Sequence, residues 1–254
     1  GEDHGAHDVS SLLPGSKDAK AASKQFEDDM DAGVQTFLEY AEKYGAGELE
    51  TGNRRLEPEG LPDGTKKFSV TAAITDWEVS PGKVVKAWTY NEQVPGPWIK
   101  VDPGDKVQVE VTNNLPISTD VHWHGIDVPF EMDGLAPITQ NYIQPFDTFS
   151  YEFTAPDYPQ LGMYHAHHHG MEAVVNGLFA VIQVGEVDLS TARGRSFGNL
   201  EVPADVQVDQ EIPMVLNDAG VIGLSLNGKA YPATEPVVAD QGDWVLLHFY
   251  NEGL

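Results

Sequence analysis

The sequence predicts a mainly β protein, built as an antiparallel sandwich or barrel. From Lys66 onward, short runs rich in Val, Ile, Thr, Trp and Phe alternate with turns rich in Pro, Gly and Asn. Such runs, with regular turns and little helical periodicity between them, are typical of packed β-sheets. The chain has 254 residues, of which 41% are hydrophobic, so it can form a core in one large domain or two moderate ones.

Residues 1–65 differ from the rest, because the stretch Ala19–Tyr44 carries apolar residues three and four positions apart. This spacing predicts an amphipathic helix in an acidic N-terminal extension, packed against the body or against another subunit. Gly45 is the predicted end of the helix. We interpret His4 and His7 as part of a frayed terminus rather than as a metal site.

The main domain is predicted to span residues 66–190. Examples of its strands, each bounded by turn residues, are Phe68–Trp77, Val84–Tyr90, Lys106–Thr112, Thr148–Phe153 and Gly177–Val184.

An internal repeat predicts the start of a second domain. Pro97–Leu115 and Glu235–Leu254 each contain an extended segment, a turn ending in Gly-Asp, an alternating apolar strand and a turn containing Asn. We therefore predict that residues 191–209 form a linker and that residues 210–254 begin a second, truncated sandwich. This second copy stops before the position at which the first copy has its clustered histidines.

Six of the nine histidines fall in two short segments, and four of them form two His-x-His pairs. The pairs are His122 with His124, and His165 with His167. In a strand, residues i and i+2 point to the same face. Two such strands side by side are therefore predicted to hold four imidazoles around one volume. Neutral imidazole suits Cu, Zn, Fe and Ni, and ligands about 7 Å apart suit a cluster better than a single ion.

Composition excludes several classes of site and partner. The chain has no cysteine, so it cannot build the thiolate-containing blue-copper site by itself. The formal charge of −25 repels nucleic acid and anionic substrates, and either serves solubility or concentrates metal cations. No apolar run has the length of a membrane helix.

The order of these motifs resembles the first cupredoxin domain of the multicopper oxidases, such as laccases. The resemblance covers about residues 68–186, and its motifs are His122-Trp123-His124-Gly125, Met132-Asp133-Gly134, Ile138-Thr139-Gln140, Pro145, the Thr148–Phe153 strand and His165-Ala166-His167. It implies a Greek-key β-sandwich of the cupredoxin type.

The resemblance also implies a role for each position. His122 would bind the type 2 copper, and three histidines would bind the type 3 pair, namely His124, His165 and His167. Asp133 would be the catalytic carboxylate that feeds protons to oxygen, although Asp-Gly is also a common turn.

Two departures from the family pattern concern the second histidine segment. Gly162 lies closer to His165 than is usual, and His168 with His169 extends the tract; we interpret the two extra histidines as lying beside or away from the metals. Trp123 is interpreted as core and His248 as structural. Packing is the preferred account of three methionines, Met132, Met163 and Met171.

The implied function is that of a laccase-like oxidase, which couples one-electron oxidation of a reducing substrate to four-electron reduction of O2 to water. This chain would supply half of a trinuclear copper cluster. The other half, and the type 1 copper with its cysteine, would come from a further cupredoxin domain in a longer precursor or in another subunit. A homo-oligomer is expected, with a trimer favoured.

Several alternatives stay open. The electron donor is a phenol, Mn(II), Fe(II) or Cu(I), and the acidic surface mildly favours a metal cation. The family habit implies a periplasmic or extracellular location, although no leader is seen in this sequence. The alternative function is a non-catalytic copper-binding or delivery module, or a proteolytic fragment of an oxidase.

Overall fold

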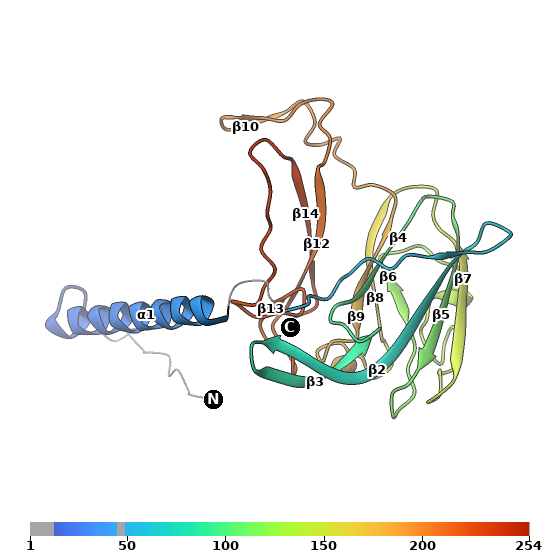
Figure 1. Cartoon of the computed structure of the whole chain (residues 1–254), viewed down its shortest axis with the longest axis horizontal. Coiled ribbons are helices and arrows are strands. Elements are labelled where there is room, and N and C mark those ends of the chain that lie inside the picture. Colours follow the sequence, from blue (N-terminus) through green and yellow to red (C-terminus); the bar gives the residue numbers. More distant parts are fainter. Residues whose placement is uncertain (1–12, 45–48, 254) are drawn as a thin grey trace.

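The computed structural model describes residues 13–44 and 49–253 and is built mainly of strands (Figure 1). The strands are β1 (Glu59–Gly60), β2 (Lys66–Ser80), β3 (Lys83–Tyr90), β4 (Gly96–Val101), β5 (Lys106–Asn113), β6 (His122–His124), β7 (Thr148–Thr154), β8 (Gln160–His165), β9 (Phe179–Val184), β10 (Ser196–Phe197), β11 (Leu200–Glu201), β12 (Gln210–Asn217), β13 (Ser225–Leu226) and β14 (Val245–Asn251). The helices are α1 (Lys17–Tyr44), the 3-10 helix η1 (Phe130–Met132) and α2 (Gly170–Ala173). Among the described residues, no helix is both long and apolar enough to cross a membrane.

Two sheets form the sandwich that the sequence predicted. One has the order β1-β2-β5-β7, with β3 also paired to β2, and the other has the order β4-β9-β8-β6. The sheets are mixed rather than purely antiparallel, because β2 pairs with β5 and β4 pairs with β9 in parallel. These parallel pairs join strands that are separated by crossings of the chain between the two sheets, as in a Greek key.

The main core lies between the two sheets. Alternating residues of β5 point inward, and Val107, Val109 and Val111 are buried. From the opposite sheet, Trp123 and Tyr164 meet them, and their ring centroids lie 5.6 Å apart. Trp123 is therefore a core residue, as predicted, and its burial fixes the strand on which the two neighbouring histidines stand.

A second core covers the outer face of the four-stranded sheet. Phe179 and Val181 of β9 pack there with Val215 of β12, so β9 is buried on both faces. This explains why Gly177–Val184 reads as a continuous apolar run rather than an alternating one. The residues after 209 are thereby attached to the first sandwich by apolar contacts.

The internal repeat is visible in the strand pairing. β12 pairs in parallel with β14, as β2 pairs with β5, and the registers correspond: Gln210 lies opposite Val245, and Lys66 opposite Val107. The turns before β5 and β14 also match. In the first turn the Asp105 carboxylate accepts a hydrogen bond from the backbone N–H of Asp102, at 2.6 Å, and in the second a bond of the same kind measures 2.9 Å.

The second copy forms only a small sheet of order β13-β12-β14. Apolar side chains of this part stay exposed, among them Val238 at 73% and Phe249 at 61%. The described residues thus form a cupredoxin-type sandwich, followed by a small three-stranded sheet that repeats the β2–β5 pairing.

The predicted N-terminal helix is present as α1, and it projects from the β body (Figure 1). Met30, Val34 and Leu38 of its apolar stripe are 68%, 43% and 54% exposed. These three side chains are therefore not packed against the body, and contact with another subunit stays a prediction. Gly45, His4 and His7 lie outside the described residues.

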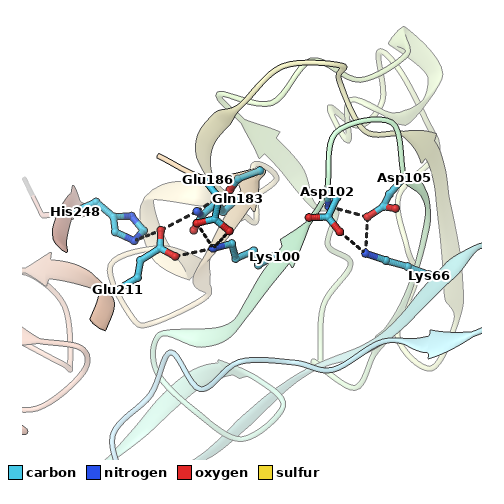
Figure 2. Close-up of polar contacts among 9 residues, drawn as sticks. Lys66, Lys100, Asp102, Asp105, Gln183, Glu186, Glu211 and His248 are labelled. Atoms are coloured by element: carbon cyan, nitrogen blue, oxygen red, sulfur yellow. Dashed lines mark hydrogen bonds and ion pairs between the residues drawn. The ribbon is translucent and has the colours of Figure 1, made fainter. Parts of the chain in front are cut away.

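A buried polar cluster joins the sandwich to β12 (Figure 2). The Lys100 ammonium lies 2.6 Å from a Glu211 carboxylate oxygen, and these side chains are 10% and 14% exposed. Gln183 donates a second hydrogen bond to Glu211 at 2.8 Å, and His248 Nε2 lies 3.6 Å away. Burial alone would lower the pKa of Lys100, but hydrogen bonds to Glu211 and Glu186 outweigh it and raise that pKa. His248 is buried beside this ion pair, which agrees with the structural role predicted for it.

Replacing Lys100 with methionine is expected to lower the free energy of unfolding by about 3 kcal/mol, because Glu211 would keep a buried charge without a cation. Urea unfolding measures the change. Lys86→Met is the matched control: Lys86 pairs with Asp76 at 2.7 Å, but the two side chains are 72% and 63% exposed. An exposed pair contributes about 0–1 kcal/mol. Equal losses in both variants would contradict the role assigned to Lys100.

Candidate metal centre

The first three candidate histidines stand on two adjacent antiparallel strands. β6 pairs with β8 so that His122 lies directly opposite His165. Residues opposite each other in a sheet point to the same face. The ring centroids of His122 and His165 are 5.6 Å apart, and His124 lies 5.8 Å from His122 and 5.6 Å from His165. The structure therefore brings these imidazoles together, as the His-x-His spacing predicted.

His167 reaches the same place by a different route. β8 ends at His165, and the chain then turns into α2, so His167 is not on a strand. The expectation that its pair shares a strand face was wrong. Its ring centroid still lies 5.9 Å from that of His122. Turn geometry, not strand periodicity, brings in the fourth imidazole.

Hydrogen bonds fix which ring nitrogens face the shared volume. His122 Nδ1 donates to the backbone carbonyl of Asp133 at 2.8 Å, and His165 Nδ1 donates to that of Ala166 at 3.0 Å. Since a carbonyl oxygen only accepts, both rings carry their lone pair on Nε2. His165 Nε2 faces His124 Nδ1 at 3.4 Å. A histidine whose far nitrogen is held by a carbonyl is the usual arrangement of a metal ligand.

Asp133 lies beside His122, because the loop after η1 packs closely against the start of β6. A carboxylate oxygen of Asp133 is 3.4 Å from His122 Nδ1, and the side chain is 31% exposed. Gly134 follows with φ +77°, and a Cβ there would lie 1.7 Å from the carbonyl oxygen of Val121. Only glycine allows this approach, so the Met132-Asp133-Gly134 segment is more than a surface turn.

Asp120 is a residue of the site that sequence reasoning missed. Its side chain is 0% exposed, and one carboxylate oxygen accepts hydrogen bonds from the backbone N–H groups of His167 and His168, at 2.8 and 2.7 Å. The other oxygen accepts from the N–H of Ala136 at 3.1 Å. In the sequence it is one polar residue in a turn-rich stretch, and only its place two residues before His122 is a signal.

The two extra histidines turn away from the shared volume. His168 packs its ring against Tyr142, with centroids 4.4 Å apart, and against His169 at 4.0 Å. His169 has φ +56°, which ends any strand continuation, and is exposed. Among the methionines, Met163 is buried as predicted, but Met171 is 76% exposed, so packing does not explain it.

Gly162, which precedes the second histidine segment, lies where β8 passes β6. A Cβ on this residue would lie 2.3 Å from the carbonyl oxygen of His124. The absence of a side chain lets β8 approach β6 closely at this point.

The four histidines differ in their exposure to solvent. His122 and His165 are partly buried, whereas His124 and His167 are exposed. Burial lowers the pKa of His165 below its ordinary value, because the charged form loses hydration. The shift favours the neutral imidazole, the form that a metal ligand requires. Among the described residues, no three His, Asp or Glu side chains already converge as a ligand set for one metal ion.

The fold and this group of imidazoles define a cupredoxin-type β-sandwich with a candidate multinuclear metal centre. Residues 71–187 match the family model of the multicopper oxidases. Over 121 residues the chain is 41% identical to a multicopper oxidase of Mycobacterium tuberculosis and 36% identical to a laccase of Pestalotiopsis fici. Residues 71–187 therefore match the multicopper oxidase family, and the rest of the chain lies outside that match.

Solved structures agree with this placement over a larger part of the chain. A multicopper oxidase crystal structure, 26% identical, covers 84% of this chain with a TM-score of 0.61, and the match spans 73% of that protein. A blue copper oxidase of Nitrosomonas europaea, 25% identical, covers 74% with a TM-score of 0.62. The matched segment makes up only 23% of the Mycobacterium tuberculosis protein and 20% of the Pestalotiopsis fici laccase.

Proposed function

We propose that this chain supplies half of the trinuclear copper cluster of a laccase-like oxidase. The whole enzyme would couple one-electron oxidation of a reducing substrate to four-electron reduction of O2 to water. Copper ions, when bound, supply the redox chemistry, because they can pass single electrons while being held by imidazole. The single observation that carries the proposal is that the ring centroid of His122 lies 5.6–5.9 Å from those of the other three histidines.

The donor set fits copper by its chemistry. Three imidazoles lie within 5.6–5.9 Å of the His122 ring, and the chain has no cysteine thiolate to compete for the ions. We assign His122 to the type 2 copper and the other three, His124, His165 and His167, to the type 3 pair. His122 and His165 already have their proton-bearing nitrogen on a backbone carbonyl, so their Nε2 lone pairs need no rearrangement to bind.

Asp133 is assigned to proton delivery. Its carboxylate lies beside His122 and is 31% exposed, so it can take a proton from solvent at the edge of the cluster. A positioned carboxylate of this kind is a suitable proton donor to oxygen during its reduction. Its backbone carbonyl at the same time orients the His122 ring.

The remainder of the enzyme has to supply the rest of the cluster and the type 1 copper with its cysteine thiolate. We propose that these come from a further cupredoxin domain, in a longer precursor or in a partner subunit of a homo-oligomer, with a trimer favoured. The electron donor is a small reducing substrate or a metal cation, and the acidic surface favours a cation. A periplasmic or extracellular location fits the same proposal.

Copper titration of the purified chain tests the proposal directly. We expect the chain to bind copper and to stay without the intense blue band of a type 1 site, because it has no cysteine. Competition with a chelator of known affinity gives the stoichiometry and affinity, and the visible spectrum gives the type. A blue spectrum, or no copper uptake, would contradict the assignment.

A non-catalytic copper-binding module is the second candidate. The exposure of His124 and His167 favours it, since two exposed imidazoles can receive and release an ion. Oxygen consumption separates the two candidates. An oxidase consumes O2 once the other cupredoxin domain is present, whereas a delivery module transfers copper to an acceptor and consumes none.

A further inference from the structure

Three chain segments carry the candidate site, and one carboxylate joins all of them. Asp120 belongs to the segment that leads into β6, accepts two hydrogen bonds from the turn that holds His167, and accepts one from Ala136 in the loop after Asp133. We propose that Asp120 is the positioning residue of the metal centre. The inference deepens the proposed function and rests on it for the identity of the bound metal.

The need for such a residue follows from the end of β8. Up to His165 the backbone is held by ladders with β6 and β9. Beyond it, the N–H of Ala166 bonds to Leu178 at 3.3 Å, and both of the next two N–H groups bond to Asp120. After β8 ends, the Asp120 carboxylate provides the hydrogen-bond acceptor for the backbone N–H groups of His167 and His168. The backbone of His167 is therefore set by a side chain rather than by the sheet.

The backbone on both sides of Asp120 is held by hydrogen bonds, so its carboxylate has a fixed position relative to the rest of the site. The next N–H, on Val121, donates to the hydroxyl of Tyr151 at 2.9 Å. The preceding residue, Thr119, forms an isolated bridge with Ile143, with backbone bonds of 3.0 and 2.9 Å. Asp120 is 0% exposed, so its carboxylate is shielded from bulk solvent.

The contacts of Asp120 are to backbone only, which separates its role from ligation. A ligand meets the metal with its own atoms, whereas this carboxylate is occupied by three N–H donors. Outer partners of this kind orient the ligands, and losing them weakens metal affinity by about 10–100-fold.

Two substitutions of Asp120 and one matched control test the proposal on the 254-residue chain. Asp120→Ala removes all three acceptor contacts, and Asp120→Asn retains one acceptor oxygen and should give an intermediate effect. The control is Asn113→Ala, because Asn113 is also 0% exposed and also makes three hydrogen bonds to backbone, to Leu115, Ile117 and Ile143. It makes none to the histidine turn.

The first readout needs no metal. In the copper-free chain, amide hydrogen exchange at His167 and His168 is expected to rise at least about 10-fold in Asp120→Ala and to stay unchanged in Asn113→Ala. The second readout is copper affinity of the folded protein, expected to fall about 10–100-fold in Asp120→Ala only. Thermal unfolding of each variant shows that folded chains are compared.

The outcomes separate this inference from the proposed function. Unchanged exchange in either folded Asp120 variant overturns the positioning role, and so does raised exchange with wild-type copper affinity. Equal affinity losses in Asp120→Ala and Asn113→Ala also overturn it, because general destabilisation would then be sufficient. If the wild-type chain binds no copper, the proposed function fails, and the exchange measurement alone decides whether Asp120 fixes the turn.

Discussion

Replacing His165 with alanine is expected to lower the copper affinity of the chain by more than about 100-fold, since losing even an outer partner of a ligand costs about 10–100-fold. The ring of His165 lies 5.6 Å from both His122 and His124, so the substitution removes a ring that is close to two of the other three. O2 reduction by the completed enzyme is expected to disappear. Chelator competition measures the affinity, and circular dichroism checks that the sandwich stays folded.

The control for this prediction is His169→Asn. His169 belongs to the same tract but is exposed, and its backbone has φ +56°, a conformation that asparagine tolerates. We expect wild-type copper affinity and activity from this variant. Full oxidase activity in His165→Ala would show that the four-imidazole assignment is wrong.

Replacing Asp133 with asparagine is expected to leave copper content unchanged and to slow O2 reduction by about 100-fold, the lower range for losing a positioned proton donor. Copper is retained because His122 bonds to the backbone carbonyl of Asp133, which the substitution preserves. Steady-state oxygen consumption of the copper-loaded, completed enzyme measures the rate.

Asp127→Asn serves as the matched control for Asp133. Asp127 lies in the same connection between β6 and β7, and its carboxylate accepts hydrogen bonds from Tyr158 and Gln160 rather than facing a histidine. The same chemical change there should leave turnover unaltered. Wild-type turnover in Asp133→Asn would make Asp133 a turn residue, whereas equal slowing in both variants would point to a general effect of charge.

Much of the secondary structure could be predicted, because the spacing of apolar residues along the sequence indicates which side chains a strand or helix buries. The alternation in Lys106–Thr112 matches the buried face of β5, and the stretch Ala19–Tyr44 lies within α1. What the pattern could not give is the pairing of strands. β4 and β9 are partners across a long stretch of chain, and nothing local in Gly96–Val101 records that contact.

The grouping of His122, His124 and His165 could be predicted from the sequence, but the way in which the site is built could not. His122 and His165 face each other as the strand rule requires. His167 lies near His122 although it is not on a strand, because Asp120 holds the backbone of its turn. A buried carboxylate bound to backbone N–H groups has no sequence pattern of its own. The Lys100–Glu211 pair was missed for a related reason, since each residue alone resembles a solvated charge. Interactions between distant residues decide these features.

The two parallel ladders of the repeat have a kinetic consequence. β2 cannot join β5, and β12 cannot join β14, through a short hairpin, because each pair is separated by an intervening stretch of chain. The entropy of closing such loops has to be lost before the ladder contributes any stabilisation. Proteins dominated by such non-local pairing acquire their native state slowly, in milliseconds to seconds rather than microseconds. During synthesis, β2 can pair early with β3, and β12 with β13. The opposite edge of each strand stays unpaired until β5 or β14 has been made, and in that interval it can pair with the wrong strand.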